Sequence, residues 1–184
     1  MAPRSTFRSP PKPTPEQVLK AAILLMEGVA QQLQPAEVQR LQHARAFVEA
    51  RRQMPRELLL ALQQDYMRVR STQLQLVDAT EELTPFLFPQ ELETVHTSRI
   101  ALESGRLVPN DLIVRLSEAR LRAALPTILE HLENLHAFMT DAEHHLVQQA
   151  NLDLQTLGGI HPKVQQKILK LQQSIVQRQH MGMG

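Results

Sequence analysis

The sequence predicts an all-α protein: an antiparallel bundle of about six to seven helices that follows an extended, basic, proline-rich N-terminal arm. Apolar residues recur at helical spacing along most of the 184-residue chain, and no stretch shows the period of two that marks a strand. Aromatic residues make up only 3% of the chain, which disfavours an aromatic-rich β-sandwich or barrel. Proline suits the first turn of a helix, and one precedes each apolar stretch, at Pro15, Pro35, Pro55, Pro89, Pro109, Pro126 and Pro162.

The first part of the chain contains three predicted helices. Residues 15–32 form the first, which a capping box of Thr14 and Gln17 opens. Residues 35–53 and 55–80 form the second and the third. We expect the apolar residues of each helix to lie on one stripe that faces the core. In the first helix this stripe consists of Val18, Ala22, Leu25, Val29 and Leu33.

An apolar corner follows at residues 84–89. It holds two of the five phenylalanines of the chain, Phe86 and Phe88. We expect both rings to be buried at one end of the bundle, because an apolar turn bounded by prolines has no reason to face water unless a partner covers it.

The second part of the chain contains a fourth helix over residues 89–104 and a fifth that opens at Pro109. Pro126 either starts a sixth helix or kinks a continuous one, because the two share a register that runs on to Gly158. A last helix is predicted over residues 162–179. The chain is thereby divided into an extended basic arm (1–13), a helical bundle (14–157), and a Gly-Gly hinge with a C-terminal basic amphipathic helix (158–184).

Charge is segmented along the sequence. Residues 1–70 hold eleven Lys and Arg against six Asp and Glu, a net charge of +5. Residues 71–162 hold five against thirteen, a net charge of −8, and residues 163–184 hold four cations and no acid. Either the signs cluster on an ordinary solvated surface, or the basic ends meet polyanions or the acidic segment of a neighbouring copy, which gives head-to-tail assembly.

Two groups of cations are candidates for contact with nucleic acid or with a protein partner. The first would follow phosphates without reading sequence, because the chain has few aromatic rings to stack on bases. The second lies on one face of the last helix, which is a candidate for docking on a partner, for a membrane surface or for closing the bundle. The first group is Arg4, Arg8, Lys12, Arg40, Arg45, Arg51, Arg52 and Arg56, and the second is Lys163, Lys167 and Lys170.

Signals for catalysis are sparse. The chain has no cysteine, no glycine-rich phosphate loop, no Gly-x-Ser-x-Gly and no His-Glu-x-x-His motif. Two Glu-x-x-His pairs have the spacing used in di-iron helical bundles, but roughly 0.6 such pairs are expected by chance. We therefore expect no enzyme activity, no metal site and no cofactor, and we keep a di-iron enzyme as the third alternative. The pairs are Glu93 with His96 and Glu133 with His136.

We expect neither a targeting segment nor a membrane span. The N-terminal residues lack the apolar stretch of a secretory signal. The longest apolar run covers residues 21–26, and a membrane span needs about 20 apolar residues. The expectation is a soluble protein that acts inside a cell or within a particle.

These observations favour a non-catalytic structural or assembly subunit of a homo- or hetero-oligomeric complex, which acts through helix–helix contacts and segregated charge. The alternative is a nucleic-acid-coating protein that binds the DNA or RNA backbone through the arm and the second helix. The layout of a basic proline-rich arm before an antiparallel helical bundle is similar to that of the coat subunits of some filamentous viruses that wrap DNA. This resemblance, which is one of layout, implies a virion component.

Overall fold

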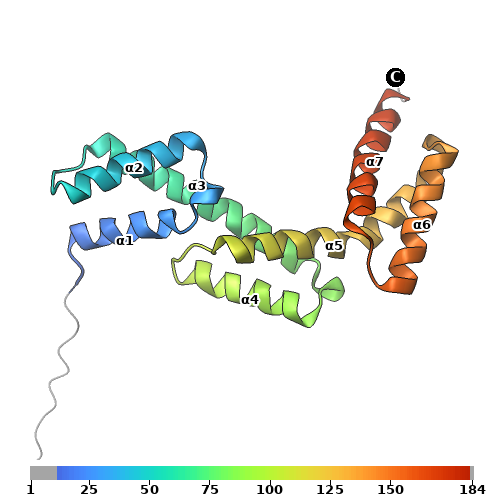
Figure 1. Ribbon diagram of the computed structural model, residues 1–184, viewed down its shortest axis with the longest axis horizontal. Helices are drawn as coiled ribbons and strands as arrows, with labels where there is room; N and C mark the ends of the chain where they lie inside the picture. The colour runs from blue at the N-terminus through green and yellow to red at the C-terminus, as the bar shows by residue number, and fades with distance from the viewer. Residues whose placement is uncertain (1–11, 183–184) are drawn as a thin grey trace, which may run out of the picture. The chain divides into compact units, whose positions relative to one another are not determined.

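The computed structural model of the protein describes residues 12–182 (Figure 1). These residues form α-helices and short 3-10 helices and no strand, which confirms the predicted all-α fold. Residues 1–11 of the predicted arm lie outside the described residues. In chain order the elements are α1 (Pro15–Glu27), η1 (Ala30–Gln32), α2 (Pro35–Glu49), α3 (Arg56–Glu81), η2 (Thr84–Phe86), α4 (Pro89–Glu103), α5 (Asn110–Asn134), η3 (His136–Phe138), α6 (Asp141–Leu157) and α7 (Pro162–Met181).

Among the described residues, every α-helix except α6 starts as the proline pattern predicts. The capping box of the first helix is confirmed, because the Thr14 N–H donates to Gln17 Oε1 at 2.9 Å and the Gln17 N–H donates to Thr14 Oγ1 at 3.3 Å. Pro126 lies inside α5, so this helix is continuous through the proline. The other six prolines of the predicted pattern stand at a helix start or one residue before it: Pro15, Pro35, Pro55, Pro89, Pro109 and Pro162.

Two predicted helix ends are too late in the chain. The first helix ends at Glu27 instead of residue 32, because the chain turns at Gly28 and continues as η1. The second helix ends at Glu49 instead of residue 53. Its last turn is closed by Arg51, which adopts the left-handed conformation with φ 51°.

The prediction of an unbroken helical register up to Gly158 is also wrong. α5 ends at Asn134, η3 follows, and α6 begins at Asp141. A second capping box opens α6: the Thr140 N–H donates to the Glu143 carboxylate at 2.8 Å, and the Glu143 N–H donates to Thr140 Oγ1 at 3.3 Å. The apolar spacing hides this break, because residues of the turn between the helices still pack on the core.

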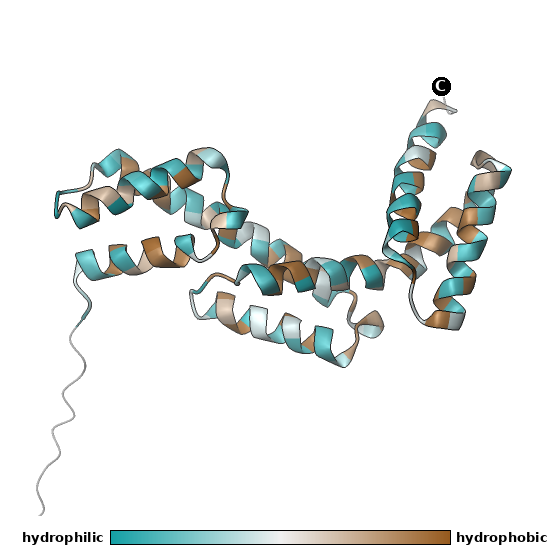
Figure 2. Cartoon of the chain, viewed as in Figure 1, coloured by the Kyte–Doolittle hydropathy of each residue, from teal (hydrophilic) through white to brown (hydrophobic). Residues whose placement is uncertain are grey.

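The described residues fall into two compact units, each with its own apolar core. Unit 1 consists of residues 12–77 and 96–113, and unit 2 of residues 78–95 and 114–182, so the boundaries fall inside α3, α4 and α5. Hydrophilic and hydrophobic residues are interspersed along each helix, as an amphipathic helix requires (Figure 2). The core of unit 1 includes Ile23, Met26, Leu41, Ala44, Leu62 and Val69, and that of unit 2 includes Leu129, Leu132, Val147, Ile168, Leu171 and Ile175.

The apolar corner of unit 2 differs from the prediction. Phe86 and Phe88 are 47% and 51% exposed, so the expected burial of both rings is wrong, and Leu87 between them is the residue that enters the core. Arg122 of α5 explains the arrangement. Its guanidinium lies 3.8 Å from the centroid of the Phe88 ring, and it donates to the Phe86 carbonyl at 2.8 Å. The guanidinium of Arg122, which also pairs with Glu91, thus covers the Phe88 ring, and the ring does not fill the core.

Candidate interaction site

An apolar groove lies between α1 and α3 in unit 1. Its volume is about 770 Å³. Hydrophobic side chains and one tyrosine form its walls, and the polar groups at its rim are side-chain amides. We name it the α1–α3 groove and define it by Val18, Ala22, Leu25, Leu59, Leu62 and Tyr66.

The sequence of α1 explains why the groove is apolar. Its buried residues, Ile23 and Met26, belong to the core of unit 1. Three members of the predicted stripe, at the i, i+4 and i+7 positions, form a second apolar face of α1 that lines the groove: Val18, Ala22 and Leu25. Val29 of the same stripe lies in the core, as predicted. Val18 was expected in the core and is instead 54% exposed, because the core face of α1 is rotated from the predicted one. Helix α1 thus has more apolar surface than its own unit covers.

A basic hollow of about 710 Å³ adjoins the groove and shares Leu19 and Leu59 with it. Its cations are Lys20, Arg51 and Arg52, which we name the basic edge, and Glu16 is the single carboxylate among its lining residues. Lys20 pairs with Glu16 at 2.9 Å and holds the pKa of that carboxyl below its usual range. Arg51 and Arg52 form no ion pair with this carboxylate, although the charge of Arg51 also contributes to lowering the pKa of Glu16.

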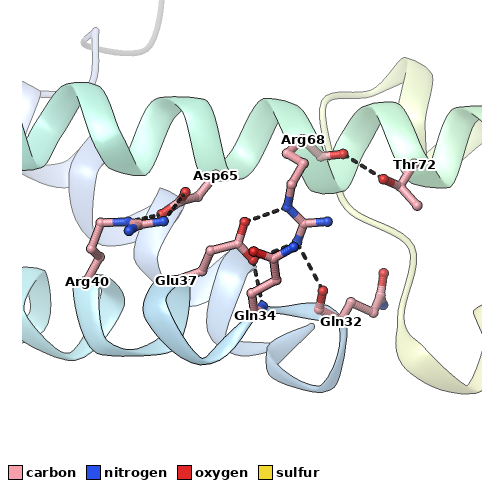
Figure 3. A network of polar contacts seen from close by, with 7 residues as sticks. All are labelled: Gln32, Gln34, Glu37, Arg40, Asp65, Arg68 and Thr72. Carbon is pink, nitrogen blue, oxygen red and sulfur yellow. Dashed lines mark hydrogen bonds and ion pairs between the residues drawn. The ribbon is translucent and has the colours of Figure 1, made fainter.

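Two of the candidate cations are occupied by ion pairs within unit 1. Arg40 of α2 makes two hydrogen bonds with Asp65 of α3, both at 2.7 Å (Figure 3). Arg45 bridges Glu27 and Glu49, in each case at 2.8 Å. A guanidinium that is held by a carboxylate in this way is less available to a phosphate or to a partner.

The other candidate cations of the first group lie on the surface or outside the described residues. Lys12, Arg51, Arg52 and Arg56 are exposed, and within residues 12–182 none of them forms an ion pair. The three arginines lie at the turn from α2 to α3. Arg4 and Arg8 belong to residues that the structure does not describe.

An ion pair between the partly exposed Arg68 of α3 and the buried Glu37 of α2 joins these two helices. Arg68 donates to the Glu37 carboxylate, in one bond at 2.6 Å, and to the Gln32 carbonyl at 3.1 Å (Figure 3). Glu37 also accepts from the Gln34 N–H at 2.7 Å, which caps α2. The hydrogen bond from Arg68 holds the pKa of the buried Glu37 carboxyl below its usual range. Sequence reasoning missed this pair, although the spacing of Gln34 and Glu37 is that of a capping box.

A buried glutamine secures the loop between α4 and α5. The Gln73 side chain donates to the Val108 carbonyl at 3.0 Å and accepts from the Val108 N–H at 2.8 Å. It also donates to Gln32 Oε1 at 2.7 Å, and Gln32 in turn donates to Asn110 Oδ1 at 2.6 Å. These hydrogen bonds attach the loop to α3 and give its buried polar groups their partners.

The second group of candidate cations lies on α7 in unit 2. Lys163, Lys167 and Lys170 are exposed. The apolar face of α7 contributes Ile168, Leu171 and Ile175 to the core of unit 2. The predicted roles of this helix are docking on a partner, binding to a membrane surface and closing the bundle. Its packing on the core supports the last of these.

Neither Glu-x-x-His pair is part of a cluster of potential metal ligands among the described residues. Glu93 and His96 are both exposed. Glu133 accepts from the Asn151 side chain, and His136 Nδ1 lies 3.2 Å from the Glu133 carbonyl. Within residues 12–182 no group of three His, Asp or Glu side chains is arranged to hold a metal ion.

Comparison of the chain with protein-family models, with curated proteins and with solved structures finds no match. Among the described helices, none has both the length and the apolar composition that crossing a membrane requires.

Proposed function

We propose that the protein is a non-catalytic assembly subunit that binds another protein chain through the α1–α3 groove. The supporting observation is the second apolar face of α1, which unit 1 leaves open to solvent. A contiguous exposed apolar surface with a polar rim is typical of a protein interaction site.

The energetics favour covering this surface. Removing one aliphatic side chain fully from water contributes roughly 1.5–3 kcal/mol. Partial burial of several such side chains along the groove therefore stabilises a complex by several times the thermal energy. The charges of the basic edge favour one orientation of the bound partner.

Two valines of equal exposure provide a matched test of this function. Val18 in the groove and Val114 on α5 of unit 2 are both 54% exposed. We expect the native mass of the full-length protein, measured by light scattering with co-purifying partners retained, to exceed that of one chain. Val18→Asp should reduce the assembled fraction at least about tenfold, and Val114→Asp should leave it unchanged. If the Val18→Asp variant assembles as well as the Val114→Asp variant, the proposal is contradicted.

A second candidate function is coating of nucleic acid. It is supported by the exposed arginines at the turn from α2 to α3, Arg51, Arg52 and Arg56, which form no ion pair among the described residues. Such cations bind phosphates without sequence preference, and the dependence of binding on salt tests this function.

A further inference from the structure

We infer that the α1–α3 groove takes an acidic amphipathic helix of a partner protein; this inference rests on the proposed function. The lining residues extend along α1 from Pro15 to Met26. At a rise of 1.5 Å per residue this is about 17 Å, or roughly three helical turns. A partner helix with apolar side chains at the i, i+4 and i+7 positions matches that length.

The fold favours a helix as the occupant. Residues 12–182 contain no strand, so the described part of the chain offers no sheet edge to which an extended peptide could add. Both helices supply apolar side chains to the walls of the groove: Val18, Ala22 and Leu25 on α1 and Leu59, Leu62 and Tyr66 on α3. Two helices that flank a groove accept the ridge of a third.

Charge selects the chemistry of the partner. The basic edge carries Lys20, Arg51 and Arg52 beside one carboxylate, whereas the polar residues on the groove itself, Gln17 and Gln63, are neutral. A helix with carboxylates along one flank of its apolar stripe therefore meets opposite charge on one side and no charge on the other. This asymmetry of charge also favours one orientation of the bound helix over the reverse one.

The arm of the chain lacks the required charge. Residues 1–11 contain Arg4 and Arg8 and no Asp or Glu, so they would meet the basic edge with like charge. A partner helix rich in Asp and Glu is complementary where the arm is not.

The test uses the full-length protein and two labelled helical peptides of about 15 residues, a length that allows roughly four turns. Both peptides carry leucines at the i, i+4, i+7 and i+11 positions; one has glutamates along one flank and the other has lysines in their place. We expect fluorescence anisotropy to show that the glutamate peptide binds at least about tenfold more tightly than the lysine peptide. Equal affinities, or no binding of the glutamate peptide, would overturn the inference.

Substitutions locate the binding. Val18→Asp should weaken binding of the glutamate peptide at least about tenfold, and Val114→Asp should not. Arg51→Ala combined with Arg52→Ala should weaken the glutamate peptide several-fold and leave the lysine peptide unchanged. Circular dichroism melting curves confirm that each variant is folded. A glutamate peptide that binds all variants equally would place its site elsewhere and overturn the inference.

The two proposals fail separately. If Val18→Asp disrupts the native assembly and the glutamate peptide does not bind, the partner chemistry is wrong and the assembly function stands. If the assembly is a dimer of this chain that Val18→Asp dissociates, a second copy occupies the groove and the inference of a different partner is overturned. If Val18→Asp affects neither assembly nor peptide binding, both proposals fail.

Discussion

Arg51 adopts a backbone conformation that usually belongs to glycine. Its N–H donates to the Val48 carbonyl at 3.1 Å, and the next N–H, that of Arg52, donates to the Phe47 carbonyl at 3.0 Å. This is the Schellman pattern of hydrogen bonds, which requires a left-handed residue after the helix. At the end of α4 the same position is filled by Gly105, with φ 75°.

Arg51→Gly should therefore stabilise the protein. A left-handed residue with a side chain stores strain, and glycine relieves it at the cost of more freedom in the unfolded chain. We expect the free energy of unfolding in urea to rise by about 0.5–1 kcal/mol. Arg52→Gly is the control. Because Arg52 has an ordinary φ, this variant of the protein should lose stability. A loss of stability in Arg51→Gly would contradict the assignment of strain.

Glu143 should make the stability of unit 2 depend on pH. The hydrogen bonds from Arg178, both at 2.8 Å, lower the pKa of this carboxyl from 4.5 to about 2. A depressed pKa in the folded state stabilises the fold fully above the unfolded value of 4.5, and this stabilisation is lost as the pH falls towards 2. Because its side chain is 24% exposed, we expect Glu143→Gln to cost only about 1–2 kcal/mol at pH 7.

The measurement is a series of chemical denaturation curves between neutral pH and the acid limit. The gap in unfolding free energy between the wild type and Glu143→Gln should narrow below pH 4.5. Glu130→Gln alters an exposed carboxylate on α5 and should leave the curve unchanged across the range. A gap that stays constant with pH would show that the carboxylate charge does not contribute.

At the scale of the elements, Gln73 attaches Val108 of the α4–α5 loop to α3. Gln73→Ala leaves the Val108 N–H without its acceptor and the Val108 carbonyl with only the 3.4 Å hydrogen bond from Gln32 Nε2, and we expect a loss of about 2–3 kcal/mol. The same substitution should accelerate hydrogen exchange at the Val108 amide. Gln75→Ala, on the exposed side of the same helix, should change stability by less than about 0.5 kcal/mol. Unchanged exchange at Val108 would contradict the role of Gln73.

The local chemistry of helix starts could be predicted from the sequence. Proline positions and the Thr14 capping box acted as expected, because both depend only on neighbouring residues. The break before α6 could also have been found, since Thr140 and Glu143 have capping-box spacing, but the apolar register across Leu135 and Met139 masks it.

The facing of α1 could not be predicted from periodicity. Apolar residues occupy almost every position between Val18 and Met26, so any stripe among them is equally apolar. Which side meets the core depends on α2 and α3, and these contacts are long-range. The exposure of Phe88 has the same origin, because Arg122, which covers the ring, is distant in the sequence.

At the scale of the whole molecule, the charge segmentation separates the two proposed functions. For binding to duplex phosphates, deletion of residues 1–13 should lower the slope of log affinity against log salt by up to about 2.7, since it removes three cations. Arg51→Ala with Arg52→Ala should lower it by up to about another 1.8. Arg45→Ala is the control, because this guanidinium is held by two carboxylates.

Filter binding over a range of salt concentrations provides these slopes. No binding by the full-length protein at about 50 mM salt would remove the nucleic-acid function, because phosphate contacts are strongest when salt is low. The basic ends would then be left to contacts between protein chains.

The chain contains one tyrosine and no tryptophan, and the tyrosine is Tyr66 in the wall of the groove. Its hydroxyl donates to the Gly105 carbonyl at 3.0 Å, so the ring is held in place. The tyrosine fluorescence of the unlabelled protein therefore originates from a single residue of this surface. Binding in the groove of a molecule that lacks tyrosine and tryptophan should therefore change the fluorescence of Tyr66. Binding at a distant site should leave this fluorescence unchanged.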